Sequence, residues 1–225
     1  MKRRKSVCEA LSLEYNEKMF KPKHFYSFCK RCSDILLSGI SLILLSPLYL
    51  IIMILVKCTS KGPIFYSHKR IGKNGKEFKM LKFRTMKVDN RPIEEILTPE
   101  QLEEWKKDYK VTNDPRITKF GKFLRKSSLD ELPQLWDVFV GKMSIVSWRP
   151  IIDEELLKYS TEERKLLLKI KPGVTGFWSS HGRSSVTYEE RVKMELYYVY
   201  KRSFWLDLRI MYHTVIGVFR RDGAK

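Results

Sequence analysis

The sequence predicts an α+β protein that is attached to a membrane. Three observations predict this class. Residues 35–56 form an apolar segment of 22 residues without a formal charge, and residues 62–86 carry a β-hairpin signal. Residues 204–219 form an aromatic stretch typical of a helix at a membrane interface, with an ordinary core helix as the alternative. The remainder of the chain shows helical patterns, which places a mostly helical soluble part next to the hairpin.

The charge distribution supports a membrane partner. The chain has 225 residues, 44 basic and 26 acidic, for a net charge of +18, and its length suits one domain with appendages. Residues 1–31 carry a net charge of +6 and residues 57–89 carry +8, whereas residues 32–56 contain only Asp34. An apolar segment between two basic blocks indicates anionic headgroups, and nucleic acid is the rival interpretation of the basic pI.

Composition excludes other classes. Apolar residues make up 43% of the chain, which rules out a wholly disordered protein, and four cysteines do not make a disulfide scaffold. A secretory signal is not expected either, because the residues after the basic start are mixed and polar. Cys29-x-x-Cys32 is better explained by two reduced thiols than by zinc, which needs about four ligands.

The apolar segment has two interpretations that the residues leave open. A straight helix over residues 35–56 would reach about 33 Å, close to the thickness of the hydrocarbon core. Ser46-Pro47 falls in its middle, where proline kinks a helix, and both flanks are basic. The segment is therefore a kinked span or a re-entrant hairpin whose two ends stay on one side; a buried soluble helix is the third alternative.

Local signals predict the elements that follow. Asn74-Gly75 predicts the turn of a hairpin over residues 62–86, with Lys82 and Arg84 on one face of the return strand, where a solvated face is the simplest interpretation. Residues 92–108 predict an acidic surface helix. Ser128-x-x-Glu131 matches a capping box, which would put Asp130 and Glu131 at the start of a helix.

Asp130 and Glu131 are the candidate chemical groups. Acids at a helix start are usually structural, because the helix dipole stabilises their charge. Two adjacent carboxylates can instead do chemistry, since one can attack phosphorus as a nucleophile with Mg²⁺ or cations to screen the phosphate. Arg125, Lys82 and Arg84 are the candidate cations for such a phosphate.

Motifs along most of the chain resemble one known family, the bacterial sugar transferases that are monotopic polyprenyl-phosphate phosphoglycosyl transferases. The resemblance runs from about Lys30 to Arg221. The motifs that carry it are Lys30-Arg31-x-x-Asp34, Ser46-Pro47, Gly62-Pro63, Lys82-Phe-Arg-Thr-Met86, Asp114-x-Arg116-x-Thr118-x-x-Gly121, Arg125-x-x-Ser-Leu-Asp130-Glu131-Leu-Pro-Gln-Leu-Trp136, Arg149-Pro150, Pro172-Gly173-x-Thr175-Gly176 and Gly182-Arg183.

The resemblance implies a fold and a membrane attachment. Such proteins are monotopic membrane proteins with a re-entrant membrane helix that breaks at Ser-Pro, here Ser46-Pro47, a small β-hairpin, and a helical catalytic domain that lies partly at the interface. The implied division is a lead-in at 1–28, a re-entrant helix-hairpin at 29–57, and a catalytic domain at 58–225 on the cytoplasmic face of the bacterial inner membrane.

The resemblance also implies a reaction. The family transfers a phosphosugar from a UDP-sugar to a polyprenyl phosphate such as undecaprenyl phosphate, which releases UMP and starts the assembly of a glycan. Asp130 would be the nucleophile and a ligand of Mg²⁺, and Glu131 its partner. Lys82, Arg84 and Arg125 would bind phosphate, and Arg149, Pro150, His181 and Arg183 would line the nucleotide-sugar pocket. Membrane lipid, downstream glycosyltransferases and a second copy of the chain are the other expected partners; nucleic acid is not.

Five residues depart from the family pattern. They are His68, Ser147, Trp148, His181 and Glu195, and they put the identity of the sugar in doubt. They also motivate an alternative function, a catalytically silent membrane scaffold of the same fold.

Overall fold

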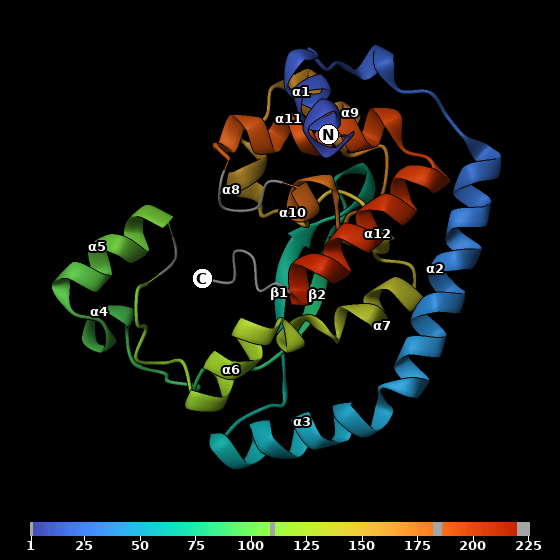
Figure 1. Cartoon of the computed structure of the whole chain (residues 1–225). Coiled ribbons are helices and arrows are strands. Elements are labelled where there is room, and N and C mark those ends of the chain that lie inside the picture. The colour runs from blue at the N-terminus through green and yellow to red at the C-terminus, as the bar shows by residue number, and fades with distance from the viewer. Residues whose placement is uncertain (1, 109–110, 182–185, 220–225) are drawn as a thin grey trace. The chain divides into compact units, whose positions relative to one another are not determined.

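The computed structural model describes residues 2–108, 111–181 and 186–219, which form helices and two small sheets (Figure 1). The architecture is therefore α+β, as the sequence predicts. Its elements in chain order are α1 (Lys2–Ser12), η1 (Glu17–Met19), α2 (His24–Leu44), α3 (Ser46–Thr59), β1 (Phe65–Ile71), η2 (Lys73–Gly75), β2 (Glu77–Phe83), α4 (Ile93–Ile96), α5 (Pro99–Asp108), α6 (Lys119–Ser127), η3 (Leu129–Glu131), α7 (Gln134–Phe139), β3 (Ser144–Val146), α8 (Asp153–Leu156), α9 (Thr161–Leu167), β4 (Gly173–Thr175), α10 (Phe177–His181), α11 (Tyr188–Lys201) and α12 (Phe204–Phe219).

The chain divides into two compact units. The first unit is built from Met1–Leu44, Ser67–Leu81 and Gln134–Lys225, and the second from Leu45–Tyr66 and Lys82–Pro133. These units follow from contacts within the protein. The predicted division into residues 1–28, 29–57 and 58–225 followed instead from which segment is expected to enter a membrane. That membrane-based division stays a prediction.

The core of the first unit surrounds the C-terminal helices. Trp148, Phe177 and Tyr198 are almost completely buried there, beside β3 and β4, which pair in parallel with Ser144 opposite Gly173. A Cβ at Gly173 would lie 2.2 Å from the Ser147 backbone nitrogen, so only glycine permits this approach. The segment at 1–28 joins the core through Ala10, and the sequence alone did not reveal this contribution.

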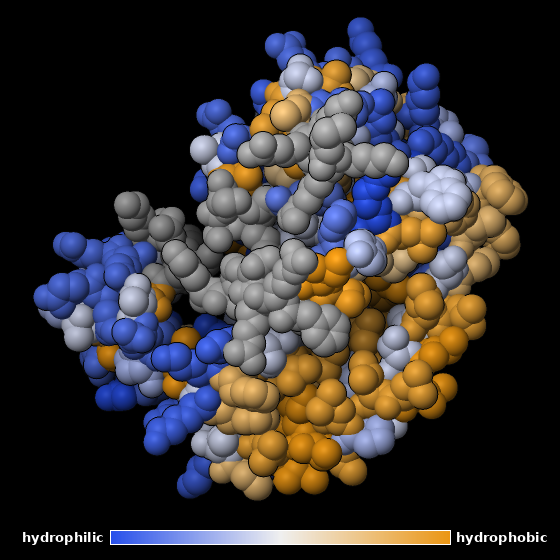
Figure 2. Space-filling model, in the orientation of Figure 1, coloured by the Kyte–Doolittle hydropathy of each residue, from blue (hydrophilic) through white to orange (hydrophobic). Residues whose placement is uncertain are grey.

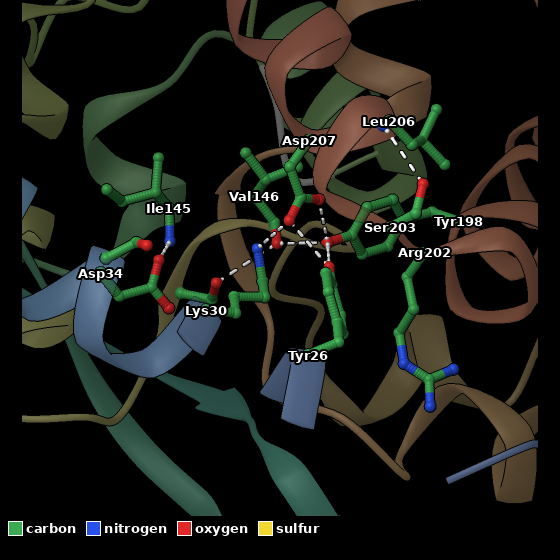
Figure 3. A network of polar contacts seen from close by, with 12 residues as sticks. Tyr26, Lys30, Asp34, Ile145, Val146, Tyr198, Arg202, Ser203, Leu206 and Asp207 are labelled. Carbon is green, nitrogen blue, oxygen red and sulfur yellow. Dashed lines mark hydrogen bonds and ion pairs between the residues drawn. The ribbon is translucent and has the colours of Figure 1, made fainter. Parts of the chain in front are cut away.

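Polar residues on one face of α2 fasten this helix within the first unit (Figure 3). Lys30 pairs with Asp207 at 2.9 Å, Arg31 donates to the carbonyls of Val138 and Phe139, and Asp34 accepts the Ile145 N–H. The motif Lys30-Arg31-x-x-Asp34 therefore orients the helix. Its other face exposes apolar side chains, including Phe28, Leu36, Ile40, Ile43 and Leu44. Figure 2 shows an orange, hydrophobic area along α2.

The hairpin forms as the sequence predicts. Strands β1 and β2 pair, and Asn74 and Gly75 between them have φ angles of 58° and 74°, the left-handed conformations that this turn requires. The simplest interpretation of Lys82 and Arg84 was wrong, however. Neither lies on a solvated strand face, because β2 ends at Phe83, Lys82 is half-buried and Arg84 is buried.

The second unit packs α3 and α6 around Phe83. Ile52 and Val56 of α3, Leu124 of α6 and Phe83 form its buried cluster. Burial of these four side chains contributes roughly 2 kcal/mol each, and so holds α3 against the end of β2. The opposite face of α3 exposes Leu50, Ile51, Ile54 and Leu55.

The apolar segment is divided between two helices. Helix α2 ends at Leu44, and α3 begins at Ser46 with Pro47 in its first turn. Backbone N–H groups of the first turn have no partner within the helix, so the missing N–H of proline costs no hydrogen bond there. Within the described residues, no single helix is long and apolar enough to cross a membrane, but α2 and α3 meet that standard together and are bent by 62°.

Two local predictions were wrong. Residues 92–108 form two helices, α4 and α5, because the chain leaves the helical conformation at Leu97 before Pro99 begins the second helix. The capping box at Ser128 does not form either. Ser128 adopts a φ of 58° and closes α6, and its side chain caps nothing in the turn that follows.

Candidate active site

Asp130 and Glu131 lie on a tight turn. The single 3₁₀ turn Leu129–Glu131 is closed by backbone hydrogen bonds from Glu131 to Ser128 and from Leu132 to Leu129. The left-handed conformation of Ser128 makes this abrupt turn after α6 possible. We call residues 129–132 the Asp-Glu turn. It holds Asp130 buried, with 8% of its surface exposed, and leaves Glu131 half-exposed.

Lys82 joins the two carboxylates. Its Nζ lies 2.7 Å from Glu131 Oε1 and 3.9 Å from Asp130 Oδ2. Lys82 is the penultimate residue of β2. Because the next residue, Phe83, is packed in the buried cluster, the backbone position of Lys82 is fixed. The structure thus brings together Lys82, Asp130 and Glu131, three residues that the sequence predicted as one site.

Arg125 reaches the same region from α6. Gly121 allows this approach, since a Cβ there would lie 2.0 Å from the carbonyl oxygen of Thr85. One turn later Arg125 lies on the same face of α6 and donates from Nε to Thr85 Oγ1 at 2.9 Å. Thr118 caps the helix by accepting the Gly121 N–H, which explains the spacing Thr118-x-x-Gly121.

The site perturbs the pKa of Asp130. Burial raises the pKa of this carboxyl above its usual value, and the negative charge of Glu131 adds to the effect. The positive charges of Lys82 and Arg125 act in the opposite direction. Carboxyl groups with a perturbed pKa cluster at functional sites, so Asp130 is a candidate reactive group.

Arg84 has a different role from the other predicted phosphate ligands. Its guanidinium donates to the carbonyl oxygens of Lys61, Ser60 and Val56, all at the C-terminal end of α3. A cation at this end of a helix satisfies carbonyls that have no partner within the helix. Arg84 therefore holds α3 in place, and phosphate binding by Arg84 stays an untested prediction.

The residues predicted for the nucleotide-sugar pocket belong to the first unit. Arg149 is exposed, Pro150 is buried, and His181 ends α10, where it stacks on Phe177 at a centroid distance of 4.3 Å. Arg183 lies outside the described residues. The pocket itself remains a prediction.

Three of the residues that depart from the family pattern, Ser147, Trp148 and Glu195, are buried. Trp148 is 1% exposed and donates from Nε1 to the Ile170 carbonyl, and Glu195 is 1% exposed and accepts the Tyr159 hydroxyl at 2.5 Å. Glu195 also accepts Arg191 Nε at 3.3 Å, and burial raises its pKa. Both side chains contribute to the core of the first unit.

The carboxylates of Asp130 and Glu131 are suitable ligands for a magnesium ion that also binds a substrate phosphate. Mg²⁺ prefers hard oxygen ligands and is commonly held by one or two carboxylates together with substrate phosphates. Asp130 and Glu131 supply such oxygens. The residues present therefore fit an ion that is shared with a substrate.

Two residues of this site were missed by the sequence analysis. Thr85 holds Arg125, and its place inside Lys82-Phe-Arg-Thr-Met86 was the available signal. Tyr49 of α3 donates its hydroxyl to the Leu132 carbonyl at 2.5 Å. Its only sequence signal was its position two residues after Pro47, which says nothing about a contact so far along the chain.

Comparison with known proteins identifies the family that this fold and site belong to. Residues 25–221 match the family model described as bacterial sugar transferase, so the chain belongs to the bacterial sugar transferase family.

Particular relatives share much of the sequence. The chain is 44% identical over 205 residues to the UDP-galactose-lipid carrier transferase of Erwinia amylovora, with 90% of this chain and 43% of that protein covered. It is 44% identical to the exopolysaccharide production protein ExoY of Rhizobium meliloti, with 87% of each covered. It is also 44% identical to the undecaprenyl-phosphate galactose phosphotransferase of Salmonella typhimurium, with 88% of this chain and 42% of that protein covered. The chain thus spans less than half of several longer relatives and most of ExoY.

Proposed function

We propose that this protein transfers a sugar phosphate from a UDP-sugar to a polyprenyl phosphate, with release of UMP. The observation that carries the proposal is the buried Asp130, paired with Glu131 and faced by Lys82, in a member of the bacterial sugar transferase family. The names of relatives that act on UDP-galactose and undecaprenyl phosphate support both substrates.

The proposed reaction has two phosphoryl-transfer steps. In the first, a carboxylate oxygen of Asp130 forms a bond to the phosphorus that carries the sugar, and the bond from that phosphorus to UMP breaks. In the second, a phosphate oxygen of the polyprenyl phosphate attacks the same phosphorus, and the bond to Asp130 breaks. The products are UMP, a polyprenyl diphosphate sugar and the regenerated Asp130 carboxylate.

The side chains of the site have separate roles in this scheme. Lys82 and Arg125 neutralise phosphate charge and favour the ionised form of Asp130, which is the form that attacks. Glu131 accepts a proton from the acceptor phosphate when that group is protonated. Asp130 and Glu131 would also hold Mg²⁺, which supplies electrostatic screening of the donor's diphosphate when it is bound.

We place the protein on the cytoplasmic face of the bacterial inner membrane, with α2 and α3 as a re-entrant hairpin. The exposed apolar side chains of both helices support this placement, since such a surface is unfavourable in water. The break at Leu45 and the basic residues on both flanks of the segment support a return to the same side.

The reaction is tested with detergent-solubilised protein, Mg²⁺, undecaprenyl phosphate and a panel of UDP-sugars. We expect UMP release from at least one donor and, when the acceptor is omitted, a phosphosugar adduct on the wild-type protein by intact mass spectrometry. Adduct formation by Asp130→Asn would refute the assignment of the nucleophile. No release from any donor would favour the silent scaffold.

The topology is tested with native cysteines. Cys32 and Cys58 are free and exposed on either flank of the bent pair. Single-cysteine proteins that retain one or the other are labelled in intact spheroplasts with a membrane-impermeant maleimide, with inverted vesicles as the matched control. A re-entrant hairpin predicts that both label only in inverted vesicles. A kinked span predicts that one of them labels in spheroplasts.

A further inference from the structure

We propose that Tyr49 is a positioning residue, through which helix α3 sets the geometry of the Asp-Glu turn. This inference rests on the proposed function, because it assigns a role in that reaction. Tyr49 touches none of the reacting groups itself, and its hydroxyl donates to the carbonyl oxygen of Leu132, the residue next to Glu131, at 2.5 Å.

Tyr49 also contacts the other side of the site. Its ring lies 5.5 Å from the ring of Phe83, measured between centroids, and Phe83 is 1% exposed. Phe83 follows Lys82 directly, and Lys82 contacts Glu131 at 2.7 Å. The contacts therefore close a ring that runs from Tyr49 through Leu132, Glu131, Lys82 and Phe83 back to Tyr49.

In this closed set of contacts, the single side chain of Tyr49 holds two parts of the site in position. The Tyr49 hydroxyl fixes the end of the Asp-Glu turn, and its aromatic ring fixes the end of β2, from which Lys82 projects. Tyr49 projects from α3, and Ile52 and Val56 hold this helix in the same buried cluster as Phe83, while Arg84 binds its C-terminal end. A shift of α3 is therefore transmitted to the separation of Lys82 from Asp130 and Glu131.

The substitution Tyr49→Phe separates the hydrogen bond from the ring contact. It removes one hydroxyl and keeps the tilted contact between the Tyr49 and Phe83 rings. Tyr15→Phe is a matched control, since Tyr15 is 7% exposed and donates its hydroxyl to a backbone carbonyl, that of Ala10, at 2.9 Å within the first unit. Both variants lose the same kind of hydrogen bond, but only one of these bonds ends next to Glu131.

The first test does not depend on activity. Thermal unfolding is measured for the double-mutant cycles Tyr49→Phe with Asp130→Asn and Tyr15→Phe with Asp130→Asn. We expect the shift in Tm caused by Asp130→Asn to differ in the Tyr49→Phe background and to be unchanged in the Tyr15→Phe background. Equal shifts in the two backgrounds would overturn the inference, whether or not the protein releases UMP.

The second test uses the reaction. In Tyr49→Phe we expect kcat for UMP release to fall about fivefold, the factor that corresponds to one net hydrogen bond, with the KM for the donor unchanged. The acid limb of the pH–rate profile should move as well, because the environment of Asp130 changes. Tyr15→Phe should alter neither. A wild-type kcat and pH profile in Tyr49→Phe would overturn the inference alone, whereas a wild-type protein without activity but with the expected coupling would overturn the proposed function alone.

Discussion

Two buried aspartates in this protein have similar exposure and very different surroundings. Asp207 in the first unit is 6% exposed, and its carboxylate accepts hydrogen bonds from Tyr26, Tyr198 and Lys30 at 2.7, 2.7 and 2.9 Å. Asp130 in the second unit is 8% exposed, and the nearest cation that it faces is Lys82 at 3.9 Å.

Under the proposed function, this difference separates a structural carboxylate from a reactive one. A fully hydrogen-bonded carboxylate is stable and has few lone pairs left for chemistry, which suits Asp207 as the anchor of α2. A buried carboxylate with incomplete compensation has a raised pKa and an oxygen that can still form a bond, which suits Asp130. The four predictions below test this contrast, from the largest expected effect to the smallest.

Removing the reactive carboxylate should give the largest effect. Asp130→Asn is expected to lower the rate of UMP release by at least about 10⁴-fold, because loss of a nucleophile removes the covalent step. Its fold should persist, since the substitution changes little volume. The measurement is UMP release beside circular dichroism of the same preparation. A rate within tenfold of wild type would mean that Asp130 is as structural as Asp207.

Removing the structural carboxylate should act mainly on stability. Asp207→Asn is expected to lower the free energy of unfolding by about 3 kcal/mol, because Lys30 then loses its charged partner in a partly buried place. Urea denaturation in detergent measures this change. Asp207→Asn with unchanged stability would show that the hydrogen-bonded network around it contributes little, and the contrast with Asp130 would fail.

Two arginines of the second unit extend the comparison. Arg84→Met is expected to cost about 2 kcal/mol of stability, because three carbonyl oxygens at the end of α3 lose their donor. Arg125→Met should instead slow turnover with little change in stability, since Arg125 is exposed. Thermal unfolding and UMP release of both variants decide the matter, and the reverse pattern would exchange the two roles.

The smallest effect concerns pH. The pKa of Asp130 is raised in the folded state, so ionisation of this group favours the unfolded chain. Below its unfolded pKa of 3.8 both states hold the proton and Asp130 has no influence on stability. As the pH rises from 3.8 through the folded pKa, wild type loses stability that Asp130→Asn does not lose.

The Tm of Asp130→Asn should therefore exceed that of wild type at neutral pH, and the difference should shrink toward about pH 3. Asp207→Asn serves as the control, because it is expected to be less stable than wild type at neutral pH. A neutral-pH Tm of Asp130→Asn below that of wild type would contradict the incomplete compensation of Asp130.

The sequence predicted those features that depend on neighbouring residues. Asn74-Gly75 placed the hairpin turn, because these two residues adopt the left-handed conformation most readily. The aromatic stretch at 204–219 coincides with α12, whose Trp205 and Tyr212 are exposed. The helix break next to Ser46-Pro47 likewise follows from the proline itself.

Features set by distant contacts could not be predicted in this way. Ser128 matches a capping box by spacing, yet the tertiary structure uses it as the left-handed end of α6. The contacts of Arg84 with carbonyls near the end of α3 were not predicted either, because those carbonyls lie more than 20 residues away along the chain. The pairing of Lys82 with Glu131 follows from the packing of Phe83, which no local pattern reveals.

The neck between residues 85–87 and 116–118 has a practical consequence. The backbone N–H of Lys87 donates to the Arg116 carbonyl at 2.8 Å, and the backbone N–H of Thr118 donates to the Thr85 carbonyl at 3.1 Å. Met86 and Ile117 form an antiparallel bridge between them. The two ends of the acidic segment that carries α4 and α5 are therefore held together by backbone hydrogen bonds. Closing a loop of a different length there changes the entropy only slightly. This neck is therefore an insertion point, where a reporter or an affinity module can replace the native excursion while Thr85 and Arg125 keep their contact.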